Sequence, residues 1–175
     1  GALYPGGFTL NAGTVVARGV NALGSGGVLT INGGTIAANG NRDLSGKFSN
    51  IVVGGDFTLG SATTPAVGTS NLTFSNTMAL GTSTSRIITI GGTGTYTLDG
   101  VISGSSSNLT VASTAAGTIV LRGANTYNGT TTVSGGTLRL SRTGGTTLPT
   151  GNSVVVNSGA TLNITTAQQL NNVTV

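Results

Sequence analysis

Only three acidic side chains are available for acid–base chemistry in the 175 residues of this chain. They are Asp43, Asp56 and Asp99, and the sequence contains no Glu, His or Cys. Cleavage of a polysaccharide needs paired carboxyl groups or an acid–base partner, and the usual serine and cysteine triads need histidine or cysteine. The sequence therefore predicts no catalytic residue, and we expect a protein that is not an enzyme.

Each aspartate also has an ordinary structural explanation. Asp99 precedes Gly100 in a common turn dipeptide, and Asp56 follows two glycines that favour a bend. Asp43 lies beside Arg42 in a polar segment. Lys47 with one of the many serines is a formal alternative for a nucleophile, which nothing else in the sequence supports.

No metal or cofactor site is predicted either. Zinc lacks its usual His and Cys ligands. The calcium-binding nonapeptide requires an acidic residue after its glycines. The segment that begins at Gly91 has the glycines, but Thr95 stands where the acid belongs. Five Asn-x-Thr sequons, at Asn71, Asn108, Asn128, Asn163 and Asn172, are expected by chance in a chain this rich in Asn and Thr.

The basic residues do not indicate a nucleic-acid-binding protein. The net charge is +4, but a nucleic-acid footprint needs clustered basic residues with interleaved aromatic residues. Here they are scattered along the sequence at Arg18, Arg42, Lys47, Arg86, Arg122, Arg139 and Arg142. We therefore expect no nucleic-acid partner.

The three tyrosines allow two interpretations. Tyr4, Tyr96 and Tyr127 could form a surface on which carbohydrate rings stack. The favoured interpretation is that they cap turns or plug the ends of coils, because Tyr4 and Tyr127 recur at one position of an internal repeat.

The elements that would position these residues are short β-strands. Apolar residues make up 37% of the chain, enough for a core, and they occur in packets of about three to five residues between Gly, Ser, Thr and Asn. No helical periodicity extends over ten residues. About sixteen strands this short suit a parallel β-helix better than a sandwich, whose strands are longer. At roughly 20 residues per coil the chain forms about eight coils and a rod roughly 40 Å long.

A β-helix also explains the composition. We expect inward columns of Leu, Ile and Val, outward columns of Thr and Ser, and ladders of Asn at the bends. Only 6% of the residues are charged, because columns of like charge would repel. The polar segment 39–49 is expected to leave the regular surface as a loop, and the segment 61–70, which contains Pro65, to be a loop or an edge.

One sequence unit occurs twice. Residues 123–140 read GANTYNGTTTVSGGTLRL, a turn cluster followed by strand, Gly-Gly bend and strand. Residues 4–17 align with it at a constant offset of 123 positions, and VLTINGGTI at 28–36 parallels VVVNSGATL at 154–162. Repeat copies near 1–38 and 123–164 thus lie within a single β-helical segment that spans residues 1–175.

The second copy resembles the passenger-associated repeat of bacterial autotransporters, which are secreted surface proteins. The preceding residues 98–127, with an "ISG" turn before a strand that ends in "LRGANTY", fit the same pattern. The resemblance implies a right-handed parallel β-helix located outside the cell or on the bacterial surface. It implies no catalytic residue.

The expected function is a rigid, protease-resistant stalk segment of such a surface protein, and the chain reads as a piece of a longer one. Two alternatives are a fibre subunit that stacks end to end and an adhesin module that binds surface glycans. The expected partners are flanking coils of the same chain or identical subunits stacked on its ends, with surface glycans as a further possibility. No membrane insertion is expected, because no long apolar run is present.

Overall fold

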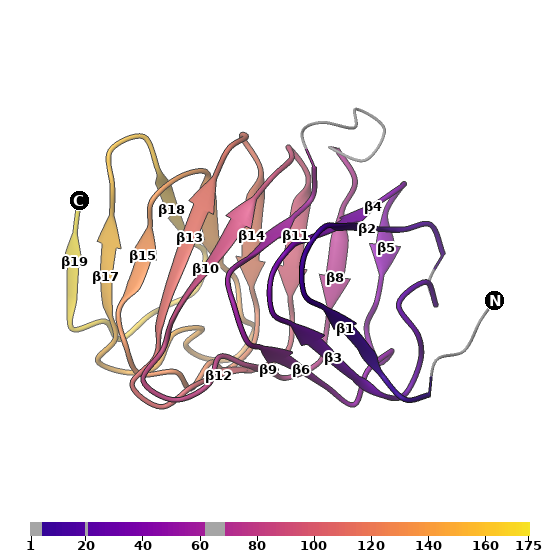
Figure 1. The fold of residues 1–175 in the computed structure, drawn as a ribbon. Helices are drawn as coiled ribbons and strands as arrows, with labels where there is room; N and C mark the ends of the chain where they lie inside the picture. Colours follow the sequence, from indigo (N-terminus) through magenta and orange to yellow (C-terminus); the bar gives the residue numbers. More distant parts are fainter. Residues whose placement is uncertain (1–4, 20, 62–68) are drawn as a thin grey trace.

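The computed structural model describes residues 5–19, 21–61 and 69–175, which fold into strands and turns. Every paired strand is parallel to its neighbours, and successive coils stack along one axis as a β-solenoid (Figure 1). Within those ranges there is no helix, and therefore none that could span a membrane. The all-β, parallel β-helical class predicted from the sequence is confirmed, whereas its right-handedness stays a prediction of the resemblance.

Three parallel sheets form the sides of the solenoid. Sheet A contains β1 (Phe8–Leu10), β3 (Val28–Ile31), β6 (Asn50–Val53), β9 (Met78–Ala79) and β12 (Ile102–Ser103). Sheet B contains β2 (Thr14–Ala17), β4 (Thr35–Ala38), β7 (Phe57–Leu59), β10 (Ser85–Ile90), β13 (Asn108–Ser113), β15 (Thr131–Val133), β17 (Ser153–Val156) and β19 (Asn172–Thr174). Sheet C contains β5 (Arg42–Asp43), β8 (Leu72–Phe74), β11 (Thr95–Leu98), β14 (Thr118–Leu121), β16 (Thr137–Leu140) and β18 (Thr161–Ile164).

From β3 to β14 the chain visits the sheets in the order A, B, C in each coil. The described strands of the first coil lie in A and B only, and after β14 the strands alternate between B and C. The described residues contain nineteen strands rather than about sixteen, and β5 in particular was not predicted, because Arg42 and Asp43 form no apolar packet. The solenoid makes about seven turns rather than the eight expected, so a coil takes about 25 residues on average and not 20. The offset between paired residues of successive coils reaches 31 positions where Phe57 in β7 pairs with Ile88 in β10.

Strand register places apolar side chains in columns inside the solenoid. Ile88, Val111, Val133 and Val156 pair in succession along sheet B, and all four are buried. In β16 the buried Leu138 and Leu140 alternate with the exposed Arg139, as predicted from the sequence. The core is therefore a continuous apolar column, and most polar residues of the strands lie outside it.

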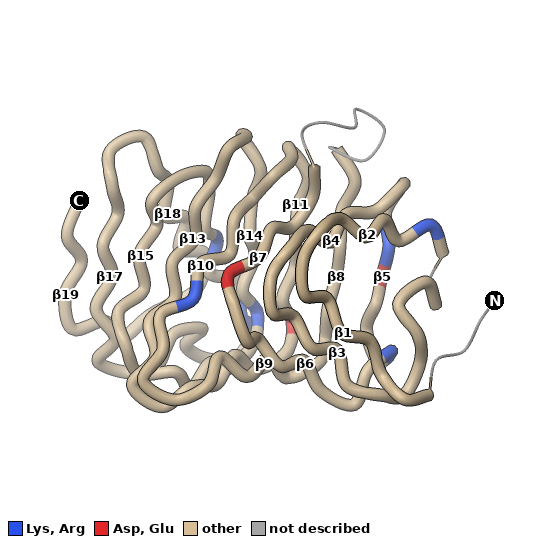
Figure 2. The backbone as a smooth tube through the Cα atoms, viewed as in Figure 1, with Lys and Arg blue, Asp and Glu red and all other residues tan. Residues whose placement is uncertain are grey.

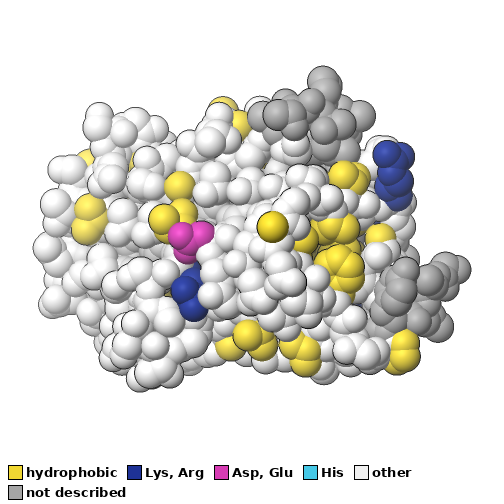
Figure 3. All heavy atoms as spheres, in the orientation of Figure 1, with side chains coloured by type: hydrophobic (Ala, Val, Ile, Leu, Met, Phe, Trp, Pro, Cys, Tyr) yellow, Lys and Arg dark blue, Asp and Glu magenta, His cyan; other side chains and the backbone are white. Residues whose placement is uncertain are grey.

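The outside of the coils carries hydroxyl and amide groups. Thr58 pairs with Thr89, and Thr110 with Thr132, on successive strands of sheet B. Most side chains over these strands are uncharged in the space-filling view (Figure 3), and the whole tube carries few charges (Figure 2). The expected amide ladder occurs at one bend, where Asn32 Nδ2 donates to Asn11 Oδ1 at 2.8 Å.

The repeated unit is one corner of the solenoid. Gly13 and Gly136, which align in the two copies, have φ values of +79° and +66°, a backbone conformation that suits glycine. The copies occupy different corners, however. The N-terminal copy joins sheet A to sheet B through β1 and β2, whereas the second copy joins sheet B to sheet C through β15 and β16. The repeat therefore specifies a corner shape, not a side of the solenoid.

Two expectations about loops have different outcomes. Segment 39–49 was expected to leave the regular surface, but Arg42 and Asp43 form β5, which pairs with β8 in sheet C. The expectation was wrong because hydrogen bonding to the next coil uses the backbone and does not require apolar side chains. Within the predicted loop 61–70, residues 62–68 with Pro65 lie outside the described residues, as do Tyr4 and the other residues before position 5.

Alternation in β16 makes a direct test of register possible. Leu138→Asp places an unpaired charge in the core, and we expect the free energy of unfolding to fall by more than about 3 kcal/mol. Arg139→Asp changes an exposed position and should cost less than about 1 kcal/mol. Urea unfolding of both variants measures the difference. Equal losses would mean that the strand is misregistered.

Candidate functional site

The three aspartates lie on different elements and each has a local partner. Asp43 is in β5, where its Oδ1 accepts a hydrogen bond from the Ser45 amide at 2.9 Å. Asp56 precedes β7, and its Oδ1 accepts from the Ile87 amide at 2.8 Å. No group of three His, Cys, Asp or Glu residues that could hold a metal is found among the described residues.

These contacts give the aspartates structural roles. Strand β10 begins before its paired region with β7, which starts at Ile88 and Phe57. The Ile87 amide therefore has no backbone partner in β7, and the Asp56 carboxylate accepts its hydrogen bond instead. The side-chain and backbone hydrogen bonds from Ser45 hold the pKa of Asp43 below its ordinary value, with a smaller contribution from Lys47. With its pKa lowered, the Asp43 carboxyl group is ionised near neutral pH and is poorly suited to donate a proton.

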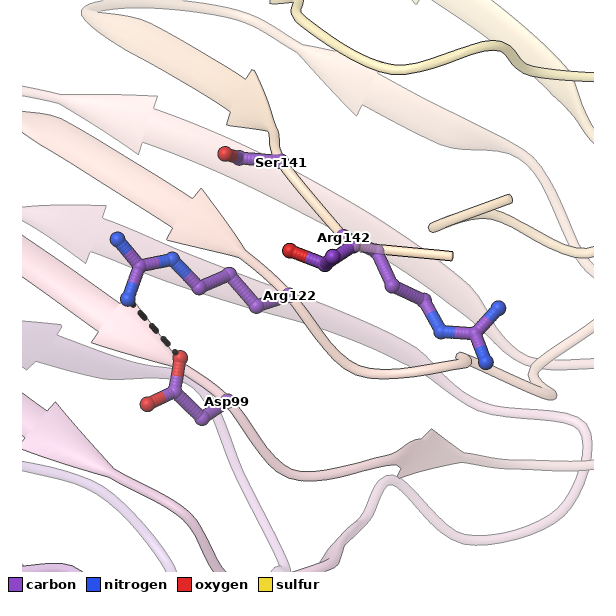
Figure 4. Close-up of a pocket in the computed structure, with 5 residues that line it drawn as sticks. Asp99, Arg122, Ser141 and Arg142 are labelled. Carbon is purple, nitrogen blue, oxygen red and sulfur yellow. Dashed lines mark ion pairs between the residues drawn. The ribbon is translucent and has the colours of Figure 1, made fainter. Parts of the chain in front are cut away.

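Asp99 takes part in a charged cluster on the outside of the solenoid. It follows β11, and its Oδ1 lies 3.6 Å from a guanidinium nitrogen of Arg122, which follows β14 (Figure 4). These two residues line an open depression of about 410 Å³ together with Ser141, Arg142 and Thr143. This is the clearest concentration of charge in the part of the chain that the structure describes.

Coil register produces the cluster from residues that are scattered in the sequence. The Arg122 amide donates to Leu98 O and the Ser141 amide donates to Leu121 O, both at 3.0 Å. Asp99, Arg122 and Ser141 therefore stand in one column at neighbouring heights. Arg139 lies two residues before Ser141 in β16 and is exposed. We call Arg122, Arg139 and Arg142 the basic corner.

Sequence reasoning missed the basic corner. Its arginines are separated by a coil length in the chain, so they look scattered until the coil length is known. The sequence did contain a clue to this neighbourhood. The strand before Arg122 ends in Leu121, and the strand before Ser141 ends in the equivalent Leu140. Aligning successive coils on Leu121 and Leu140 would have brought Arg122 beside Ser141.

A second functional candidate is the second repeat copy, residues 123–140, which we call the signature segment. A Cβ atom on Gly123 would lie 2.1 Å from Gly100 O, so only glycine fits at this approach of two coils. Asn125 is buried, and its Oδ1 accepts a hydrogen bond from the Ile102 amide at 2.7 Å. Ile102 belongs to β12, the last strand of sheet A, so Asn125 supplies with a side chain the hydrogen bond that a further strand would have made.

The rest of the segment closes the same turn. Tyr127 is fully buried, and its hydroxyl lies 2.8 Å from Thr131 Oγ1. Thr131 Oγ1 in turn donates to Asn152 Oδ1 at 2.9 Å, one coil further on. The Asn152 side-chain amide donates a hydrogen bond to Gly129 O in the preceding coil. A chain of hydrogen bonds thus ties two successive coils together where sheet A has ended.

The two described tyrosines are core residues. Tyr96 in β11 and Tyr127 are fully buried, so neither offers a ring on which a carbohydrate could stack. The structural interpretation was closer, but both lie in middle coils and not at coil ends. Burial raises the pKa of Tyr127 far above its ordinary value, with its Thr131 hydrogen bond opposing, and burial also raises the pKa of Tyr96.

The last coil exposes apolar side chains. Ile164 in β18 is 45% exposed, Val173 in β19 is 43% exposed and Val175 is 97% exposed. Each of the two strands pairs on one side only, β18 with β16 and β19 with β17. This end of the solenoid therefore presents both unpaired backbone groups and apolar surface.

Comparison with known proteins identifies the signature segment. Residues 116–140 match the family model of the passenger-associated-transport-repeat. The match spans β14, the turn with the Asn125 and Tyr127 contacts, β15 and β16. No curated protein and no solved structure matches the chain significantly. The repeat and the β-solenoid fold together support, in general, a structural stalk like that of an autotransporter passenger.

The role of Asn125 can be measured. Asn125→Ala leaves the buried Ile102 amide unpaired, and we expect a loss of about 1–3 kcal/mol in the free energy of unfolding. Asn157→Ala is the matched control, because Asn157 is exposed at a bend, and it should cost less than about 0.5 kcal/mol. Denaturant unfolding compares the two. A loss no larger for Asn125→Ala than for its control would show that the side chain does not replace a strand.

Burial of Tyr127 predicts a loss of stability at high pH. Above the ordinary tyrosine pKa of 10.0 the unfolded chain releases this phenolic proton, whereas the folded chain keeps it. The unfolded state then binds fewer protons, so stability falls as pH rises, by at most about 1.4 kcal/mol per pH unit for one tyrosine. Urea unfolding between about pH 9 and pH 11.5 should show this slope, reduced in Tyr127→Phe. An unchanged slope in the variant would contradict it.

Proposed function

We propose that this chain is a rigid stalk segment of a secreted bacterial surface protein, with a structural and not an enzymatic function. The main support is the hydrogen-bond ladder between coils, which runs through all three sheets in the direction of the axis. A rod built this way resists bending, because bending would break hydrogen bonds along one side. The passenger-associated repeat supports a location outside the cell or on its surface.

The arrangement also supports a role in presenting another part of the protein. Coils stack in sequence order, so the two ends of the rod are far apart and the sides expose no unpaired strand edge (Figure 1). Few charged or flexible side chains lie on the sides, which favours resistance to proteases. A stalk of this kind projects whatever it carries away from the cell, and coil-by-coil folding outside the cell would help to draw the chain outward.

Stiffness is the property that tests this proposal. The chain contains no native cysteine, so spin labels at Thr14→Cys in β2 and Thr174→Cys in β19 are unique. Seven strand steps of about 4.8 Å separate these strands, and we expect one narrow distance distribution near 34 Å. Pulsed electron paramagnetic resonance measures it. A broad distribution, or a mean distance far below this value, would show that the segment is not a rod.

A second function is favoured by the exposed last coil. We propose that its apolar end is covered by another coil, from a flanking part of a longer chain or from a second copy of this one. Stacking of copies head to tail is heterologous and builds an open filament and not a ring. The exposed Val173 and Val175, together with the unpaired side of β19, support this contact.

End-to-end association can be tested with the isolated 175 residues. Sedimentation should show a concentration-dependent increase in mass for the wild type, and Val173→Lys with Val175→Lys should suppress it without unfolding the middle coils. Thr110→Lys, on the side of the rod in β13, is the matched control and should still associate. A wild type that stays monomeric at high concentration would contradict stacking through this end.

A further inference from the structure

We propose that the basic corner is a binding site for an acidic polysaccharide, whose carboxylate or sulfate group contacts Arg122 and Arg139 beside the Ser141 hydroxyl. This goes beyond a stalk, and it gives the glycan-binding alternative a definite place and ligand class. The open depression lined by Asp99, Arg122 and Ser141 is the centre of the site.

Coil register brings the arginines together. Arg122 and Ser141 occupy neighbouring heights of one column, about 4.8 Å apart. Arg139, two residues before Ser141, is the diagonal neighbour of Arg122, at about 8 Å between Cα atoms. Figure 4 shows the Arg122 and Ser141 side chains on one side of the strand ends, with the Arg142 side chain pointing the other way. An anionic group above Ser141 would therefore lie within reach of two guanidinium groups.

Arg122 is not saturated by Asp99. The closest nitrogen–oxygen distance is 3.6 Å, longer than a hydrogen bond, and half of the Arg122 side chain is exposed. A guanidinium has five N–H donors in a planar fork that matches a carboxylate or sulfate. Asp99 thus holds Arg122 near the depression and leaves donors for a ligand. Arg139 is exposed on the same side of β16 as Ser141.

Arg142 forms the boundary of the site. Its guanidinium donates to Thr146 O at 3.1 Å and its amide donates to Thr147 Oγ1 at 3.2 Å, which fixes the loop after β16. A second open depression adjoins the first at Arg142 and is lined by Thr146, Thr166, Gln169 and nearby residues. Hydroxyl and amide groups therefore continue from the arginines toward the next coil.

This lining favours a polysaccharide over a nucleic acid. Ser141, Thr143 and Thr146 in the loop after β16, with Gln169 one coil further on, offer the donors and acceptors that sugar hydroxyls need. A single-stranded nucleic acid carries a phosphate at every nucleotide and binds in a continuous basic groove. Here two arginines are followed by uncharged hydroxyl and amide groups, so the spacing of charge favours a sugar polymer. A linear acidic sugar polymer fits both the charge and the hydroxyl groups.

The experiment measures binding of fluorescent oligosaccharides of equal length to the 175-residue chain at about 0.15 M salt. The probes are a sulfated, a uronate-containing and a neutral oligosaccharide, with an oligothymidylate as a further anion. We expect binding of the sulfated probe, the uronate probe or both, which names the acidic group, and weaker binding of the other two probes. Absence of binding to both acidic sugars, or equal binding of the oligothymidylate, would overturn the proposal.

Matched variants locate the site. Arg122→Gln should weaken binding about tenfold, whereas Arg18→Gln, which removes the same charge at the other end of the rod, should change it less than about twofold. Asp99→Asn should tighten binding more than Asp43→Asn does, because only Asp99 competes for Arg122. If Arg122→Gln and Arg18→Gln changed the affinity equally, or Asp99→Asn and Asp43→Asn did, the proposed location of the site would be wrong. Thermal unfolding checks that each variant is folded, and the spin-label distance tests the stalk separately.

Discussion

The structure depends on the requirement that the strands of each coil lie in hydrogen-bonding register with those of the coil before it. The main-chain hydrogen bonds run between coils, as from the Arg122 amide to Leu98 O and from the Ser141 amide to Leu121 O. A residue that widens one coil would separate these groups in the next. The constraint explains the glycine at position 123, where a Cβ atom would lie 2.1 Å from Gly100 O, and the short strands between tight corners. It also explains the low charge, since any column would repeat a charge every 4.8 Å or so.

The passenger-associated repeat lies where one of the three sheets ends. Sheet A ends at β12, although sheets B and C continue for several coils. From that point a turn replaces the missing strand. The Asn125 side chain accepts the Ile102 hydrogen bond, the Thr126 amide donates to Ile102 O, and Tyr127 fills the core and contacts Thr131. The conspicuous residues of the motif are thus those that complete a coil without a third strand. Their roles are structural, which agrees with a motif that carries no catalytic group.

Features that depend on the residues of a single strand could be predicted from the sequence. Features that depend on which residues become neighbours when coils stack could not. The alternation at Leu138, Arg139 and Leu140 is a local pattern, and the structure confirms it. Strand β5 was missed because Arg42 and Asp43 are polar, and only pairing with β8 makes them a strand. The basic corner was missed because Arg122 and Arg139 become neighbours only in register. The same limit applies to Tyr96 and Tyr127, whose burial depends on coils that no local pattern specifies.

Parallel in-register stacking of successive coils is tested most directly by nuclear Overhauser effects between backbone protons. We expect effects that connect Ile88 to Val111, Val111 to Val133 and Val133 to Val156 along sheet B. A further effect should connect Ile119 to Leu138 in sheet C. Cross-strand effects that instead join neighbouring strands of the sequence in antiparallel pairs, such as β15 with β16, would contradict a solenoid and all that has been derived from its register.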